Sequence, residues 1–197
     1  MKQKIASSLF AIGLSVLLVH VSAAAETFKI DPVHSTVGFK VRHLFSKVTG
    51  RFLDVTGEIK LDSDHIENSS VDATIQATSV NTENAMRDKH LRSPDFFDVA
   101  KFTAITFKSK KATKTGDDSG DILGDLTMHG LTKEVTLHVK FLGKGKGMQG
   151  QITTGWEATA AIKRTDFGLT WNKAIEGTAV VGDDVDIELQ IEANEAK

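Results

Sequence analysis

Apolar and polar side chains alternate along most of the chain from residue 26 onward. Val135, Leu137 and Val139, for example, alternate with Thr136 and His138. An alternation of period two places apolar side chains on one face of a β-strand and polar side chains on the other. The segments that carry this pattern are 37–41, 53–61, 71–77, 105–107, 122–128, 135–141, 156–162 and 185–191. Strands with one polar face are typical of antiparallel sheets, so the sequence predicts an all-β protein of about eight strands.

The segments between these strands contain turn-forming residues and two candidate helices. Gly- and Asp-rich linkers such as 116–120 are typical of hairpin turns. Residues 81–93 predict a short helix with Asn81 or Thr82 as its N-cap. Residues 43–47 predict a second, shorter helical turn. The predicted fold is therefore all-β with one or two short helices.

Eight amphipathic strands can form two architectures. In a sandwich, two sheets enclose a filled core, whereas a closed eight-stranded barrel has room inside for one small ligand. Small residues recur on the faces expected to point inward, where they would either leave a cavity or fit between large residues of other strands. The small residues are Gly57, Ala73, Ala77, Gly124, Ala158 and Ala160, and the large ones are Phe39, Phe107, Phe141 and Trp156. The pattern alone leaves both architectures open.

The N-terminus has the pattern of a cleavable signal peptide. Two lysines precede an apolar run at 5–21, which is shorter than the ~20 residues needed to cross a bilayer. Small residues at Ala23 and Ala25 form an A-x-A cleavage site. We therefore expect residues 1–25 to be removed on export and residues 26–197 to form a single domain.

Composition narrows the function classes. The chain has 24 basic residues, two of them in the leader, against 26 acidic residues, so the exported domain would carry a charge of −4 with histidine neutral. This balance argues against nucleic acid as a partner and against an anionic membrane surface as a constitutive location. Cysteine is absent, which excludes thiol catalysis and thiolate metal sites. No second apolar run approaches a membrane span, so no stable membrane insertion is expected.

Motifs for catalysis or metal binding are weak. The histidines of the mature chain show neither H-x-x-x-H nor H-E-x-x-H spacing, although a site assembled from separate strands stays open. His34 and Ser35 are adjacent, and adjacent residues of a strand point to opposite faces, so His34 cannot activate Ser35 directly. The acidic turns lack the glycine and terminal glutamate of a calcium loop. We therefore expect no catalytic residues, no metal and no cofactor.

Two basic groupings carry more information. Arg42 and His43 end the first long strand, and Arg87, His90 and Arg92 lie in the predicted helix. If that helix covers the mouth of a barrel, these cations would meet an anionic or polar head group. Alternatively, they form structural ion pairs with nearby carboxylates. The acidic residues available for such pairs are Asp88, Asp95 and Asp98.

Several ordered motifs extend over nearly the whole of the mature chain. They are DPVHS at 31–35, VGFKVRH at 37–43, VTGRF at 48–52, RDKHLRS at 87–93, DFFD at 95–98, GDLTMHGLTK at 124–133, RTDFGL at 164–169 and VVGDDV at 180–185. Together they resemble the YceI-like family of bacterial periplasmic, lipocalin-like proteins known for binding polyisoprenoid lipids. The resemblance implies a periplasmic location and an extended eight-stranded antiparallel lipocalin-like barrel with a long apolar tunnel. It also implies a bound amphiphile and makes a homodimer plausible.

We therefore predict a periplasmic carrier for a polyisoprenoid or another long-chain amphiphile, with an apolar tunnel that shields the tail from water. The predicted lining residues are Val37, Phe39, Val41, Ile59, Ile75, Phe107, Leu126, Met128, Val139, Trp156 and Phe167. Arg42, His43 and Arg164 are predicted to contact the head group.

Two other functions stay open at this stage. One is an enzyme or redox partner acting on a prenyl quinone through His34, His43 and His90. The other is a filled β-sandwich that serves only as an interaction module.

Overall fold

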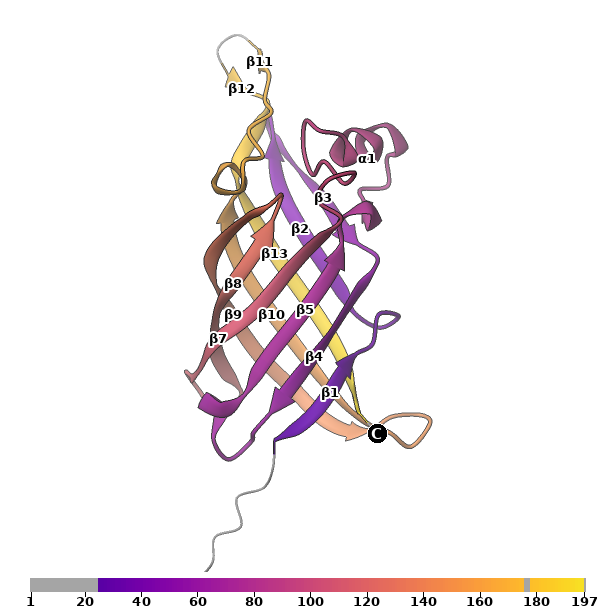
Figure 1. The fold of residues 1–197 in the computed structure, drawn as a ribbon, viewed down its shortest axis with the longest axis vertical. Coiled ribbons are helices and arrows are strands. Elements are labelled where there is room, and N and C mark those ends of the chain that lie inside the picture. The colour runs from indigo at the N-terminus through magenta and orange to yellow at the C-terminus, as the bar shows by residue number, and fades with distance from the viewer. Residues whose placement is uncertain (1–24, 176–177, 197) are drawn as a thin grey trace, which may run out of the picture.

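The computed structural model describes residues 25–175 and 178–196, and its main sheet closes into an eight-stranded antiparallel barrel (Figure 1). The barrel strands follow the order β1-β4-β5-β7-β8-β9-β10-β13, and β13 pairs back to β1. Their bounds are β1 (Glu26–Ile30), β4 (Val55–Leu61), β5 (Ser70–Gln76), β7 (Ala104–Lys114), β8 (Ser119–Met128), β9 (Leu131–Lys146), β10 (Ile152–Lys163) and β13 (Val181–Glu195). The predicted all-β class and eight-stranded antiparallel barrel are confirmed. The predicted signal peptide lies almost entirely outside the described residues.

The long strand β13 closes the barrel by pairing with the first two strands of the chain. The C-terminal part of β13 pairs with β1, and its N-terminal part pairs with β2 (Thr36–His43). A short turn at 31–35 separates β1 from β2, so the two follow one another along the same edge of β13. β3 (Ser46–Phe52) pairs with β2 and precedes β4, which pairs with β1. β6 (Val80–Asn81) pairs with β3 and completes the main sheet.

Helical segments lie at the ends of the barrel. The α-helix α1 (Ala85–Arg92) sits beside β3 at the end shown uppermost in Figure 1. Three short 3-10 helices are η1 (Ile66–Asn68), η2 (Ala77–Ser79) and η3 (Arg164–Phe167), and a small hairpin comprises β11 (Ala174–Ile175) and β12 (Thr178–Ala179). We call the end with α1, the β2–β3 turn and this hairpin the upper end. The lower end carries the β4–β5, β7–β8 and β9–β10 turns.

Two local predictions are wrong. Residues 43–47 form no helical turn, because β2 and β3 continue to the facing pair His43 and Ser46 and are joined by a two-residue turn. The helix N-cap is neither Asn81 nor Thr82 but Asn84, whose side chain accepts a hydrogen bond from the backbone N–H of Arg87 at 3.0 Å. Within the described residues, no helix is long and apolar enough to cross a membrane.

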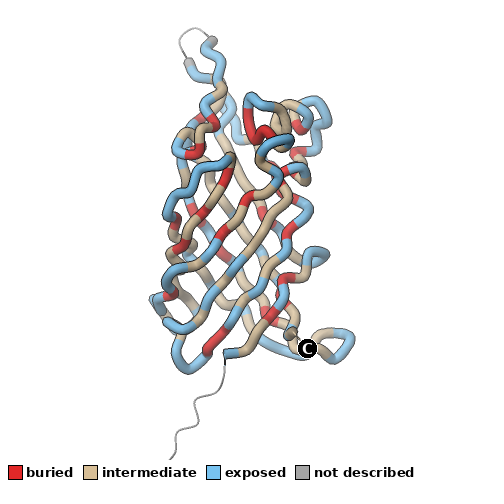
Figure 2. The backbone as a smooth tube through the Cα atoms, in the orientation of Figure 1, coloured by how far each residue is buried: buried red, intermediate tan, exposed pale blue. Residues whose placement is uncertain are grey.

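Buried or intermediate residues alternate with more exposed ones along much of the barrel strands (Figure 2). Two of the small inward residues reflect close packing. A Cβ atom on Gly124 would lie 2.5 Å from the ring of Phe107, and a Cβ atom on Gly57 would lie 2.5 Å from the carbonyl oxygen of Asp72. These two glycines therefore make room for neighbouring atoms and do not leave empty space inside the barrel.

Candidate ligand-binding cavity

The barrel encloses a cavity of about 790 Å³, which is within the usual range for small-molecule sites. Its wall is mostly aliphatic and aromatic and draws side chains from both the β1–β4 and the β7–β13 sides of the barrel. Ten of the eleven residues predicted to line a tunnel do line this cavity. They are Val37, Phe39, Val41, Ile59, Ile75, Phe107, Leu126, Met128, Val139 and Trp156. Their contact with a ligand stays a prediction.

Phe167 is the exception among the predicted lining residues. Its side chain belongs to η3, is 1% exposed and packs in the main hydrophobic core. It is not among the residues that line the cavity. Phe167 follows β10 closely in the sequence, but β10 ends at Lys163 and the chain forms η3 from Arg164 onward. Phe167 therefore belongs to the packed core, and its predicted place in the cavity wall is not found.

Charged groups of the cavity lie only at its two ends. At the upper end the lining includes Arg42, His43, Arg87, His90 and Arg164. At the lower end, the charged lining residues come from the β4–β5 and β7–β8 turns and from the adjoining ends of β7 and β8. They are Asp64, Glu67, Asp117, Asp118 and Asp121, with Lys114 as the one cation among them. The cavity is thus an apolar tube with a basic upper end and an acidic lower end.

Arg42 and His43 stand free enough to meet a ligand at the upper end. Both are exposed and end β2 just before the β2–β3 turn. The Arg42 guanidinium donates only long hydrogen bonds, at 3.2 Å to the carbonyl of Leu44 and 3.4 Å to that of Ala179. Its charge has no carboxylate partner among the described residues, so an anionic or polar head group would find an available donor.

Arg164 also lines the cavity, and its contact with a head group stays a prediction. It is 4% exposed, and its guanidinium donates to the carbonyl oxygens of Leu169, Trp171 and Gly182. It also forms an ion pair with Asp183 at 3.1 Å. These bonds use its donors to hold the segment after η3 against the start of β13. Arg164 lines the cavity but serves mainly to position the upper wall.

The alternation of apolar and polar residues does not predict an aromatic cluster that lies at the upper end. The rings of His90 and Trp171 lie 4.8 Å apart, those of His90 and Phe96 lie 5.0 Å apart, and all three residues line the cavity. His90 also pairs with Asp95 at 2.8 Å. The cluster joins α1 to the segment after η3 across the upper end. Trp171 lies in an irregular segment, where alternation gives no signal.

Trp156 marks the opposite part of the cavity. It packs against the small core cluster of Phe28, Leu61 and Ala193, next to the lower end. Its ring lies 4.5 Å from that of Phe141. Among the described residues, its indole nitrogen is the one buried side-chain polar atom without a hydrogen-bond partner. The chain's two tryptophans therefore lie at different heights of the same cavity.

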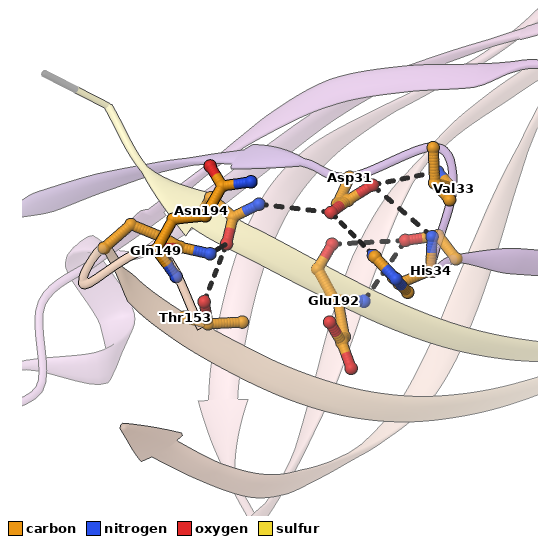
Figure 3. Close-up of polar contacts among 9 residues, drawn as sticks. Asp31, Val33, His34, Gln149, Thr153, Glu192 and Asn194 are labelled. Atoms are coloured by element: carbon orange, nitrogen blue, oxygen red, sulfur yellow. Dashed lines mark hydrogen bonds and ion pairs between the residues drawn. The ribbon is translucent and has the colours of Figure 1, made fainter. Parts of the chain in front are cut away.

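The DPVHS turn forms a polar network outside the cavity lining (Figure 3). Asp31 Oδ1 accepts the backbone N–H of Val33 at 2.9 Å, and Asp31 Oδ2 pairs with His34 Nδ1 at 2.9 Å. The Asn194 amide also donates to Asp31 at 3.2 Å, while Ser35 exchanges hydrogen bonds with the backbone of Glu192. Because Glu192 and Asn194 belong to β13, the network fastens the β1–β2 turn to that strand.

In the same network, the possible metal-ligand atoms of three side chains lie within 4.8 Å of one another. These side chains are Asp31, His34 and Glu192. The hydrogen bond that His34 Nδ1–H donates to the Asp31 carboxylate raises the pKa of His34 and lowers the pKa of Asp31. Asp31 and His34 are thus already satisfied by one another. Of the three histidines considered for quinone chemistry, His43 and His90 reach the upper end of the cavity, and His34 lies outside its lining.

The motifs and fold agree with comparisons to known proteins. A family model, described as the YceI-like domain, matches residues 28–193. Protein YceI of Escherichia coli is 44% identical over 151 residues, which cover 75% of this chain and 78% of that protein. The UPF0312 protein VPA0850 of Vibrio parahaemolyticus is 37% identical and covers 94% of this chain and 96% of its own length.

Solved structures give the same answer. The YCEI protein of Campylobacter jejuni is 36% identical with a TM-score of 0.69, covering 79% of this chain and 90% of that chain. A polyisoprenoid binding domain from Saccharophagus degradans, implicated in plant cell wall breakdown, has a TM-score of 0.62 at 18% identity. It covers 88% of this chain and 100% of that chain and shows the fold alone. The chain therefore belongs to the YceI-like domain family.

Proposed function

We propose that the protein is a periplasmic carrier that holds a long-chain amphiphile, such as a polyisoprenoid, inside its barrel. The observation that carries this proposal is the cavity of about 790 Å³, whose wall is apolar along its length and charged only at its ends. An elongated apolar space with polar ends suits a molecule that has a long hydrocarbon tail and a polar head. The proposed role is binding rather than catalysis.

The affinity of such a site would come mainly from the tail. Each Å² of apolar surface removed from water contributes about 25 cal/mol, so a long tail gains binding energy without specific contacts. A few polar groups are then enough to set its orientation. Arg42 and His43, exposed beside the upper end of the cavity, are the groups we assign to the head. Arg164 supports the wall beside them.

The comparisons support the ligand class. One relative in fold is a polyisoprenoid binding domain, and its likeness to this chain is one of architecture. An exported carrier fits the chemistry of such a ligand, because a water-insoluble lipid that crosses an aqueous compartment needs a soluble container. The signal-like N-terminus, with its basic start, apolar run and A-x-A site, supports export.

Organic extraction of the purified protein, followed by mass spectrometry, tests the proposal. We expect a long-chain amphiphile to be recovered in an amount that approaches one molecule per barrel. Protein stripped of lipid should bind a fluorescent prenyl or acyl probe with saturation. Recovery of no amphiphile, together with no saturable probe binding, would contradict the proposed function.

Cell fractionation and the mass of the exported chain test the location separately. We expect the periplasmic protein to begin at Glu26, after cleavage behind Ala25. A cytoplasmic protein that retains its N-terminus would contradict this part of the proposal and leave lipid binding untouched.

A further inference from the structure

Large apolar side chains point into solvent at the upper end of the barrel. Phe45, in the β2–β3 turn, is 99% exposed, and Met86, in α1, is 83% exposed. Both elements flank the upper end (Figure 1). A single exposed apolar residue is ordinary on a protein surface. Phe45 and Met86, however, belong to separate elements at the end where basic residues line the cavity, and they need a more specific explanation.

Basic side chains share this end of the barrel with these two apolar residues. Arg42 and His43 immediately precede the β2–β3 turn, and Lys89 lies one helical turn from Met86 on α1. Lys173 follows Trp171 in the segment that faces α1, with its ammonium 6.0 Å from the indole ring. None of the cations Arg42, Lys89 and Lys173 forms an ion pair within the described part of the chain.

Carboxylates of the upper end are for the most part already paired. Asp95 pairs with His90 at 2.8 Å, and Asp183 pairs with Arg164 at 3.1 Å. Glu83 lies 3.7 Å from Arg51. The lower end shows the reverse, because its exposed carboxylates have no ion-pair partner among the described residues. These are Asp64, Glu67, Asp117 and Asp118. Lys114 and Lys146 at the lower end are also exposed and without an ion-pair partner in the described part of the chain. The unpaired charge is therefore mainly basic at the upper end and mixed, with more carboxylates than lysines, at the lower end.

We propose that the upper end docks transiently on an anionic lipid bilayer, with Phe45 and Met86 inserted among the head groups and the cations of this end against lipid phosphates. This inference rests on the proposed carrier function and names the surface through which the carrier would load and unload. Docking in this orientation places the basic opening of the cavity directly over the lipids. A lipid tail would then pass from bilayer to barrel without crossing water.

A bilayer fits this surface better than a folded partner protein. The apolar side chains stand apart on two elements and are interleaved with cations, which is the composition of surfaces that bind at a lipid interface. A protein interface would instead favour one contiguous apolar patch. Because the exported domain would carry a net charge of −4, attraction is local and weak, and the carboxylates of the lower end are repelled. The result is an oriented and reversible contact.

Vesicle cosedimentation of the full-length mature protein tests the proposal. Vesicles of phosphatidylcholine with phosphatidylglycerol should bind the protein, and vesicles of phosphatidylcholine alone should bind it less. Raising the salt concentration should reduce the difference. Phe45→Ser combined with Lys89→Glu should weaken binding to the anionic vesicles by at least about fivefold, because each basic group near an anionic surface contributes roughly that factor.

The matched control lies at the other end of the barrel. Met148, in the β9–β10 turn, is as exposed as Phe45, and Lys146 is an exposed lysine beside it. Met148→Ser combined with Lys146→Glu changes the same kinds of side chain and should leave vesicle binding unchanged. Loss of binding in this variant but not in the upper-end variant would overturn the proposal. Equal binding to neutral and anionic vesicles would overturn it too.

A measurement without vesicles separates this inference from the carrier function. The upper-end variant should bind a fluorescent prenyl probe in solution as the wild type does, because Phe45 and Lys89 do not line the cavity. If the wild type binds the probe but binds no vesicles, docking is refuted and the carrier function stands. If the wild type does not bind the probe, the carrier function is refuted, whatever the vesicles show.

Discussion

Arg164 is a buried residue in the upper wall of the cavity. Its side chain is almost fully buried and holds the carbonyls of Leu169, Trp171 and Gly182. Arg164→Ala would leave these groups and Asp183 without a partner, so we expect the free energy of unfolding to fall by about 3 kcal/mol. Urea denaturation measures this loss.

Arg42→Ala is the matched control for that substitution. Arg42 is exposed and donates only two long hydrogen bonds, so its removal should change stability by no more than about 0.5 kcal/mol. It should instead weaken the binding of an anionic amphiphile. Equal stability of the two variants would show that Arg164 does not hold the upper wall.

Gly124 and Gly145 test the packing of the barrel interior. A Cβ atom on Gly124 would lie 2.5 Å from the Phe107 ring and 2.6 Å from the carbonyl oxygen of Lys108, which is main chain and cannot easily move. Gly124→Ala should therefore reduce stability by about 1–3 kcal/mol. Gly145 has nothing within 4 Å of that position, so Gly145→Ala should be neutral or slightly stabilising. Thermal unfolding of both variants provides the comparison, and equal effects would refute the argument.

At the scale of elements, the β1–β2 turn is held by titratable groups. The Asp31–His34 hydrogen bond raises the pKa of His34, so its contribution is complete below the usual histidine value of about 6.5 and is lost as the pH rises through the raised pKa. The pKa of Asp31 is lowered, so its contribution is present above about 3.9 and is lost as the pH falls through the lowered pKa. The pair therefore stabilises the fold most between these limits.

His34→Gln should consequently lower the melting temperature most at about pH 5–6. The difference from the wild type should shrink toward pH 8 and again toward pH 3. Repeating the substitution in an Asp31→Asn background isolates the interaction between the two side chains. A difference that stays constant with pH, or that persists without the aspartate, would show that the pair does not stabilise the β1–β2 turn.

Elements with strict alternation were predictable, and those that depend on tertiary contacts were not. β9 and β13 follow the pattern of period two because one face of each meets the barrel interior. The β2–β3 turn was misread as helical, since Leu44 adopts a positive φ of 49° with no glycine or asparagine to signal it. The start of α1 was misplaced because Asn81 and Asn84 both accept local backbone hydrogen bonds, and only the folded chain distinguishes them.

At the scale of the whole molecule, the cavity wall follows from the strands and its ends do not. Inward positions of regular strands, such as Phe107 and Val139, line the cavity as their parity predicts. The upper end is built from α1 and the irregular segment around Trp171, whose meeting is set by long-range packing. Closure of the sheet itself depends on the pairing of β1 with β13, which are the first and last strands of the chain.

The two tryptophans allow the orientation of a bound lipid to be measured. Trp171 lies at the upper end of the cavity and Trp156 toward the lower end. Trp171→Phe and Trp156→Phe each leave a single tryptophan whose fluorescence reports one height. If the head group sits beside Arg42 and His43, stearate with a nitroxide near its carboxylate should quench Trp171 more strongly. Stearate with a nitroxide near its terminal methyl should quench Trp156 more strongly.

Both probes are needed because either tryptophan can be quenched by simple proximity to any bound chain. The order of quenching must reverse between the two nitroxide positions if the lipid has one orientation. If both probes quench the same tryptophan more strongly, the chain binds in both directions. If the nitroxide near the carboxylate quenches Trp156 more strongly and the nitroxide near the methyl group quenches Trp171 more strongly, the carboxylate lies near Asp64 and Glu67. That outcome is electrostatically unfavourable, because a carboxylate brought close to two others raises the cost of its own charge. The basic upper end should therefore fix the direction in which the lipid enters.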